Sequence, residues 1–204
     1  MSLIGHDLAG HHLVGRPLWT GLHHESAHRD HVGGLILVRH AMPDVVPDVP
    51  PAEWRLSADG LVQARRLAAA LPFDAMLVSS AEPKARQTLE SLGPVATDAR
   101  FNEVARDEPF GGNFREVRAK YVGGTAYTSW EAQAAVSARF KAGVDEWIAR
   151  AGARPLIIAT HGMAMTTWLA TVVTMADPVA FWRGLIFPDA FVITPPTLRR
   201  LSDD

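Results

Sequence analysis

Three short, uninterrupted apolar runs, at residues 35–38, 75–78 and 156–159, constrain the fold more than any other feature of this sequence. Each run is too short for a buried helix, and none alternates between polar and apolar residues as a half-buried strand does. Such runs are typical of strands that are covered on both faces of a parallel sheet. Helical segments separate them, and this alternation predicts an α/β fold. We therefore expect a three-layer sandwich in which a mainly parallel central sheet is flanked by helices.

The segment at residues 57–71 has the period of an amphipathic helix. The apolar residues expected on its buried face are Leu61, Ala64, Ala68 and Leu71. Arg65 and Arg66 fall mostly outside that face, so we expect this helix to pack against the sheet on one side only.

Later segments carry signals of helix and strand boundaries. Pro83 fits the first turn of a second helix, which we expect to continue to residue 92. Thr128 and Glu131 are the two ends of a capping box, which predicts that a long helix starts there. A further helix is expected at residues 163–174, and residues 190–194 are expected to form a last strand at the edge of the sheet.

Residues 1–33 differ in composition from the rest of the chain. Seven of the nine histidines lie there, with glycines scattered among them. We interpret this segment as a histidine-rich N-terminal extension and residues 34–204 as a single domain. The extension packs either on its own domain or on a second copy of the chain, so the sequence leaves a homodimer open.

The composition of the chain limits the classes of partner and the cellular location that we expect for it. The chain has 20 Lys and Arg against 22 Asp and Glu, a net charge of −2, which gives no global attraction to nucleic acid or to a membrane surface. It has no cysteine, which excludes disulfide scaffolds, thiolate zinc sites and thiol nucleophiles and is compatible with a reducing cytoplasm. We therefore expect a cytoplasmic protein without a nucleic-acid partner.

Two segments bear on whether the chain is directed to a membrane or inserted into one. The first ten residues lack the basic and apolar regions of a signal peptide. Residues 155–176 carry no Asp, Glu, Lys or Arg and are long enough to cross a bilayer. Because Thr160, His161 and Gly162 lie inside this stretch, a strand, a turn and a helix explain it better, and we expect no membrane partner.

Polar and charged residues follow each of the three apolar runs. They are Arg39-His40, Ser79-Ser80 with Lys84 shortly after, and Thr160-His161-Gly162. Ligands of open α/β sheets bind beyond the carboxyl ends of the strands, so these side chains are expected to share one crevice. Two fixed cations, two imidazoles and helix N-termini suit a small oxyanion, above all phosphate. Each residue alone has an ordinary structural explanation, and it is their joint placement that carries the prediction.

Four sequence segments follow one another in a characteristic order and spacing. They are Leu37-Val38-Arg39-His40-Ala41, Ser79-Ser80-Ala81-Glu82-Pro83-Lys84-Ala85-Arg86-Gln87-Thr88, Phe101-Asn102-Glu103 and Ala159-Thr160-His161-Gly162. Together they resemble the histidine phosphatase (phosphoglycerate mutase-like) superfamily, over about residues 35–173. The resemblance implies the α/β fold of that superfamily, with residues 34–204 as its catalytic domain.

The resemblance also implies a phosphohistidine mechanism. We expect it to use no cofactor and no metal, because the cations at the strand ends make the pocket positive and no cluster of Asp or Glu accompanies them. His40 would attack phosphorus as a neutral imidazole whose other nitrogen is held by a backbone carbonyl. Arg39, Lys84 and His161 would neutralise the phosphoryl oxygens. Glu103 would protonate the leaving alkoxide and then activate water, a role that calls for a pKa raised by partial burial and countered by the nearby cations.

Two positions depart from the pattern of the superfamily. Ala41 stands where glycine is usual, and Lys84 stands where a second phosphate-binding arginine is usual. A lysine supplies charge but no bidentate fork, so phosphate could be held less tightly or shared with Arg86. Residues two apart on a helix point in different directions, so only one of the two can face the phosphate, and the alignment favours Lys84.

Two segments, 42–56 and 107–127, are expected to be long loops that shape substrate choice. Arg115, Arg118 and Lys120 in the second could hold another anionic group of the substrate or form a solvated basic face. The superfamily contains mutases as well as phosphatases. Residues 101–107 keep an Asn-Glu pair but lack the His-Tyr-Gly that follows it in the mutases.

We therefore expect a phosphomonoester hydrolase of the phosphatase branch that acts on a small phosphorylated metabolite. A phosphoglycerate mutase-type phosphotransferase is one alternative. A catalytically weak member that only binds phosphorylated ligands is another.

One motif points to different chemistry. Residues 24–28 read His-Glu-Ser-Ala-His, which fits the zinc-binding H-E-x-x-H pattern of metalloproteases. That motif needs a helix with one buried face, and the glycines at 21, 33 and 34 leave room for little more than two turns. Histidine is so frequent in this segment that a chance match is expected, so we favour the phosphatase.

Overall fold

The computed structural model describes residues 34–108 and 112–201. The chain divides into two units, Met1–Asp30 and His31–Asp204, and all described residues belong to the second. The predicted extension 1–33, with its H-E-x-x-H motif, lies outside the described residues. Its boundary and its packing therefore stay predictions.

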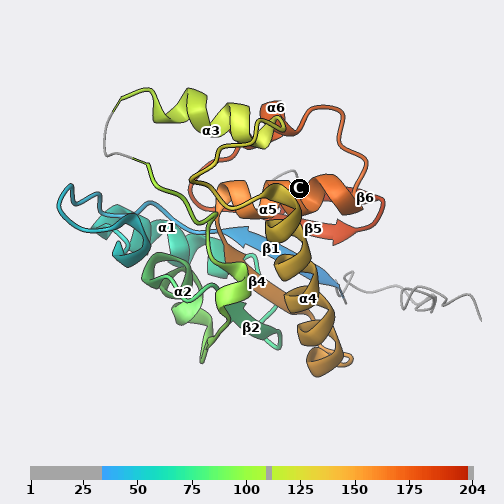
Figure 1. Ribbon diagram of the computed structural model, residues 1–204. Helices are drawn as coiled ribbons and strands as arrows, with labels where there is room; N and C mark the ends of the chain where they lie inside the picture. Colours follow the sequence, from blue (N-terminus) through green and yellow to red (C-terminus); the bar gives the residue numbers. More distant parts are fainter. Residues whose placement is uncertain (1–33, 109–111, 202–204) are drawn as a thin grey trace, which may run out of the picture. The chain divides into compact units, whose positions relative to one another are not determined.

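A central sheet runs through the second unit (Figure 1). Its six strands in the described part of the chain are β1 (Leu35–Arg39), β2 (Met76–Ser79), β3 (Ala96–Thr97), β4 (Leu156–Thr160), β5 (Asp189–Thr194) and β6 (Thr197–Arg200). They lie in the order β3-β2-β4-β1-β5-β6. The pairs β3–β2, β2–β4 and β4–β1 are parallel, whereas β5 runs antiparallel to both of its neighbours. The three apolar runs of the sequence are thus the adjacent strands β2, β4 and β1.

Helices connect most of these strands. The α-helices are α1 (Ala58–Ala68), α2 (Pro83–Leu89), α3 (Phe114–Val122), α4 (Gln133–Ala151), α5 (Gly162–Val172) and α6 (Pro178–Arg183). Short 3-10 turns occur at η1 (Pro51–Glu53), η2 (Glu90–Leu92) and η3 (Ala99–Phe101). None of the helices that the structure describes has the length and apolar character needed to cross a membrane.

Helices cover both faces of the sheet, which confirms the predicted three layers. Successive side chains of a strand point to opposite faces. Leu35 and Leu37 of β1 accordingly pack in one apolar cluster with α4 and α5, while Ile36 and Val38 pack in a second cluster with α2 and the end of α1. All four side chains are at most 1% exposed, which explains why the strand is apolar throughout.

The predicted buried face of the α1 segment is confirmed at Ala64 and Leu71 but is wrong at Leu61. Its N-cap is Ser57, whose side chain accepts a hydrogen bond from the Gly60 N–H at 3.0 Å. Ala64 is buried as expected, but Leu61 is 38% exposed. The reason is Gly60, because a Cβ there would lie 2.1 Å from the carbonyl oxygen of Met42 in the loop after β1. The buried face therefore runs through Gly60 and Ala64 and leaves Leu61 outside.

The predicted capping box at Thr128 and Glu131 does not form. The N-cap residue of α4 is Ala132, and no side chain caps this helix. Glu131 instead forms an ion pair with Arg139 at 2.7 Å and accepts a hydrogen bond from the Ala105 N–H at 3.2 Å. Its carboxylate is thus used to join α4 to a neighbouring loop.

Two expectations about irregular and edge segments are also wrong. The strand at the predicted position 190–194 is not at the edge, because the chain turns back after it and pairs Ile193 of β5 with Leu198 of β6. Residues 107–127 are not one long loop, because they contain α3, whose Ala119 and Tyr121 are buried.

Candidate active site

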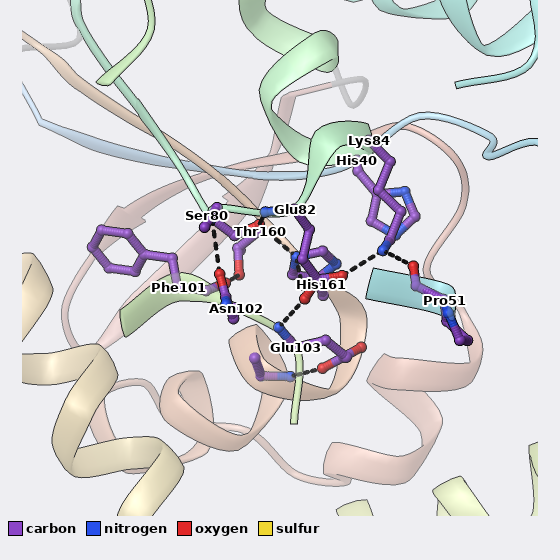
Figure 2. Close-up of polar contacts among 12 residues, drawn as sticks. His40, Pro51, Ser80, Glu82, Lys84, Phe101, Asn102, Glu103, Thr160 and His161 are labelled. Atoms are coloured by element: carbon purple, nitrogen blue, oxygen red, sulfur yellow. Dashed lines mark hydrogen bonds and ion pairs between the residues drawn. The ribbon is translucent and has the colours of Figure 1, made fainter. Parts of the chain in front are cut away.

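A cavity of about 670 Å³ opens at the carboxyl ends of β1 and β4. The predicted site residues Arg39, His40, Lys84, Glu103 and His161 all line it. They come from the ends of β1 and β4, the start of α2 and the segment after η3. Figure 2 shows His40, Lys84, Glu103 and His161 of this group. The fold thus brings together the side chains that the sequence places at separate strand ends and in the Asn-Glu segment.

His40 follows the last residue of β1 and is 6% exposed. Its backbone N–H donates to the Thr160 carbonyl at 3.0 Å, so strand pairing fixes its position. Its Nδ1 lies 2.7 Å from the Ala41 carbonyl oxygen. A carbonyl oxygen only accepts, so Nδ1 carries the proton and the lone pair of the neutral ring is on Nε2. Burial, followed by the influence of His161 and Lys84, lowers the pKa of His40 well below its ordinary value and keeps the ring neutral.

His161 is fully buried at the N-terminus of α5, with its ring centroid 5.1 Å from that of His40. Its Nε2 lies 2.7 Å from Ser80 Oγ and 3.3 Å from Glu82 Oε1. Its Nδ1 is buried without a hydrogen-bond partner among the described residues. Burial, followed by the charge of Lys84, lowers the pKa of His161, so its ring is neutral unless an anion binds beside it.

Arg39 is the last residue of β1. Its guanidinium carbon lies 3.6 Å from the centre of the Phe187 ring, and its Nη1 donates to the Leu185 carbonyl at 2.8 Å. Its Nε is buried and has no partner within the described chain. Burial is the main cause that lowers the pKa of Arg39 to about 10, which still leaves it charged near neutral pH. An unpartnered N–H on a fixed cation suits an oxyanion ligand.

Lys84 and Arg86 lie on different sides of α2. Lys84 is 5% exposed, lines the cavity and donates from Nζ to the Pro51 carbonyl at 2.6 Å. Arg86 is about half exposed and pairs with Glu90 at 2.9 Å. Of these two cations, Lys84 is the one that reaches the cavity.

Glu82 is a residue of the cavity that the sequence analysis missed. Its Oε2 forms an ion pair with Lys84 Nζ, and its Oε1 accepts a hydrogen bond from the Glu103 N–H at 2.8 Å (Figure 2). The same Oε1 lies 3.3 Å from His161 Nε2. The available signal was position, because Glu82 is the N-cap residue of α2 and lies just after the end of β2.

Glu103 contacts the N-terminus of α5. Its carboxylate accepts hydrogen bonds from the Ala164 N–H at 2.9 Å and the Met163 N–H at 3.3 Å. Burial raises the pKa of Glu103, but the neighbouring His161 and Arg106 and hydrogen bonds from backbone N–H groups outweigh it, so the pKa lies below its ordinary value. Of the two opposing effects expected, burial is therefore the weaker, because the helix N-terminus and the charge of Arg106 favour the carboxylate.

The family follows from a match over most of the chain. A family model described as "Histidine phosphatase superfamily (branch 1)" matches residues 35–193. The chain belongs to this superfamily. A comparison with curated protein sequences gave no match.

Several solved structures share the fold of this histidine phosphatase superfamily member. Mycobacterial glucosyl-3-phosphoglycerate phosphatase in complex with inorganic phosphate is 22% identical, with a TM-score of 0.59 over 81% of this chain and 94% of that one. A protein from Thermus thermophilus is 22% identical, with a TM-score of 0.61 over 83% and 99%. A variant of Entamoeba histolytica phosphoserine phosphatase in complex with phosphoserine is 14% identical, with a TM-score of 0.57 over 81% and 93%. At these identities the likeness establishes the fold.

Ala41, which stands where the superfamily usually has glycine, is part of the packed interior. It is fully buried in a small cluster with Leu56 and Ala64, and its backbone N–H donates to Thr88 Oγ1 at 3.0 Å. The adjacent Gln87 accepts a hydrogen bond from the Leu56 N–H at 2.9 Å. The Gln-Thr pair of the superfamily-like segment therefore ties α2 to the loop after β1.

The basic residues of α3 are placed unequally around the cavity. Arg118 lines it, although its Nε donates to Glu108 at 2.9 Å. Arg115 lines a smaller cavity of about 210 Å³ that shares Arg39 with the first. Lys120 is exposed and lines neither cavity. Of the three residues considered for a second anionic group, Arg115 and Arg118 are therefore suitably placed and Lys120 is not.

Proposed function

We propose that this member of the superfamily is a phosphomonoester hydrolase that acts through a phosphohistidine intermediate at His40. One observation carries the proposal. The hydrogen bond between His40 Nδ1 and the Ala41 carbonyl leaves the lone pair on Nε2, in a cavity lined by Arg39 and Lys84. A neutral nucleophile held among fixed cations is what phosphoryl transfer to histidine requires.

The proposed reaction has two steps. In the first, His40 Nε2 attacks phosphorus in line with the ester bond, the N–P bond forms as the P–O bond breaks, and Glu103 gives a proton to the leaving alkoxide. In the second, water attacks phosphorus, Glu103 takes a proton from it, and the N–P bond breaks to release inorganic phosphate. Arg39, Lys84 and His161 bind the phosphoryl oxygens in both steps and stabilise their charge.

The proposed substrate is a small phosphorylated metabolite, bound without a cofactor or a metal ion. Structures of the same fold are complexes with inorganic phosphate, vanadate and phosphoserine. Over residues 34–108 and 112–201, no three histidine, aspartate or glutamate side chains are grouped so as to hold a metal ion. Arg115 and Arg118 beside the cavity support a substrate that carries a second anionic group.

Hydrolysis of p-nitrophenyl phosphate in the presence of EDTA tests the proposal. We expect turnover by the wild type and none by His40→Ala, whose fold should be unchanged by circular dichroism. A phosphoryl group should also be found on His40 after quenching in alkali, in which phosphohistidine is stable. Full activity of His40→Ala, or loss of wild-type activity on chelation, would refute the assignment.

Incubation with 3-phosphoglycerate and a trace of the bisphosphate separates a hydrolase from a mutase. We expect slow or no release of inorganic phosphate and no 2-phosphoglycerate. Rapid isomerisation without phosphate release would make the protein a mutase. Absence of activity in both assays, together with intact phosphate binding, would make it a phosphate-binding protein.

A further inference from the structure

A buried ion pair lies in the wall of the cavity that is proposed to bind the phosphoryl group. The side chains of Lys84 and Glu82 are 7% and 8% exposed, and the ammonium contacts Glu82 Oε2. Lys84 has three N–H donors, of which one goes to the Pro51 carbonyl and one to Glu82. The lysine that would bind phosphate is therefore already bonded to a carboxylate of the same chain.

Glu82 is held by groups from three elements. Lys84 of α2 and His161 at the start of α5 face its carboxylate, and Ser80 just after β2 accepts a hydrogen bond from its backbone N–H at 3.2 Å. The Glu103 N–H bonds to its Oε1, and the Glu103 carboxylate is close enough to feel its charge. These contacts fix Oε1, so Lys84 can leave Oε2 without releasing the rest of the carboxylate.

The charges around the two carboxylates bear directly on phosphate binding. His161 is neutral, so Glu82 and Glu103 offset the positive charges of Arg39 and Lys84. A phosphoryl dianion that enters is attracted by Lys84 and repelled by Glu82, and both act at close range and out of water. The contact between Lys84 and Glu82 must therefore weaken if Lys84 is to bind the phosphoryl oxygens fully.

We propose that Glu82 is an internal competitor of the substrate for Lys84. It holds the ammonium while no oxyanion is bound, releases it to the phosphoryl group on binding, and takes it back as inorganic phosphate leaves. Glu82 acts through Lys84 and is thus a positioning residue, and this role rests on the proposed phosphate site. Its consequence is a weaker affinity for inorganic phosphate and an easier release of product.

The variant Glu82→Gln separates the two roles of this side chain. Its amide oxygen still accepts from the Glu103 N–H, but its amide nitrogen cannot accept from Lys84, so the ammonium is left to the oxyanion. We expect about tenfold tighter binding of orthovanadate and inorganic phosphate, measured as Ki against p-nitrophenyl phosphate and as Kd by calorimetry. Glu90→Gln removes a carboxylate from the exposed pair with Arg86 and should leave both constants unchanged.

Unchanged or weaker binding of the two oxyanions by Glu82→Gln would overturn the proposal, because a carboxylate with a purely structural role would only loosen the site when replaced. A crystal structure of the wild type with vanadate decides the matter even if the variant does not fold. We expect Lys84 Nζ to bond to a vanadate oxygen and to have left Glu82. A Lys84–Glu82 contact that persists beside the anion would overturn the proposal.

These experiments measure the binding of vanadate and phosphate, so the proposal about Glu82 can be tested separately from turnover. An inactive protein in which Glu82→Gln still tightens oxyanion binding would refute the hydrolase and support the competitor. An active wild type whose phosphate affinity does not depend on Glu82 would support the hydrolase and refute the competitor. Failure of both the wild type and Glu82→Gln to bind either oxyanion would overturn both.

Discussion

Lys84 and Arg86 are two positions apart on α2, and their surroundings predict opposite effects of removal. Lys84 lines the cavity, whereas Arg86 pairs with Glu90 near the surface. We expect Lys84→Ala to weaken phosphate binding by roughly 10- to 100-fold, because a charge-assisted hydrogen bond is lost and Glu82 is left unpaired. Arg86→Ala should change it less than about twofold, since exposed ion pairs contribute little. Competitive inhibition by phosphate measures both effects, and the reverse ranking would show that Arg86 holds the phosphate.

Glu103 should control the pH dependence for substrates with poor leaving groups. Its pKa lies below the ordinary value, so the protonated fraction needed in the first step falls as pH rises and is largest on the acidic side of neutral. The lowered pKa of His40 keeps the nucleophile neutral over the same range. We therefore expect an acidic optimum for alkyl phosphates and a flatter profile for p-nitrophenyl phosphate.

Glu103→Gln provides the comparison for that profile. It should reduce turnover of an alkyl phosphate by roughly 100-fold or more and that of p-nitrophenyl phosphate far less, because nitrophenolate leaves without a proton. Thermal unfolding serves as the control for folding. Equal losses on the two substrates would remove Glu103 from the acid role.

The positions of individual site residues were only partly predictable. Arg39 ends a buried strand, and His40 and His161 directly follow one. Parallel strands end at one edge of a sheet, so the sequence alone places these three residues together. Glu82 could not be assigned in this way, because its role depends on a tertiary contact with Lys84. The direction of the pKa shift of Glu103 could not be predicted from the sequence either, because it depends on contact with a helix more than fifty residues later in the chain.

Among the elements, the carboxylate of Asp98, the N-cap residue of η3, is one of the links between η3 and α4. Asp98 accepts hydrogen bonds from the Arg100 N–H at 2.9 Å and from Trp147 Nε1 at 2.8 Å. Burial raises the pKa of Asp98, but the bonds from Arg100 and Trp147 outweigh it and lower the pKa from 3.8 to about 2. A lowered folded-state pKa stabilises the fold above the unfolded pKa, and that contribution is lost as pH falls through about 2.

We expect Asp98→Asn to lower the free energy of unfolding by about 1–2 kcal/mol at pH 7. The difference from the wild type should shrink as pH falls from 5 towards 2, and urea denaturation at several pH values measures it. Asp145→Asn, which breaks the exposed pair with Lys141 on α4, should cost less than about 0.5 kcal/mol. A cost for Asp98→Asn that is independent of pH would contradict the assigned contribution.

Element types were more predictable than their details. The strands β1, β2 and β4 and the helices that follow them were expected from apolar runs and from Pro83, which are local signals. The exposure of Leu61 on α1 was not expected, because Gly60 is turned inward by its contact with Met42. The start of α4 was not predicted correctly either. The carboxylate of Glu131 forms an ion pair with Arg139 and accepts a hydrogen bond from the Ala105 N–H, so it does not cap the helix. In both cases a contact between distant segments overrides a local pattern.

For the whole domain, the layered architecture follows from the alternation of strands and helices, but the strand order does not. Nothing in a local window indicates that β4 lies between β2 and β1, or that β5 lies between β1 and β6. The antiparallel β5 and β6 complete the sheet beyond the parallel strands that the apolar runs predict.

That strand order has a consequence for how the chain is made. The neighbours of β1 are β4 and β5, so Leu35 meets Leu156 only after about 120 further residues have been synthesised. At about 5–20 residues per second, a ribosome needs roughly 6 to 24 seconds to supply them. For that interval the apolar side chains of β1 have no strand beside them, and β2 can pair only with the two-residue β3. The nascent domain therefore depends on late C-terminal strands to cover its first one, and such non-local pairing is typical of slow folding.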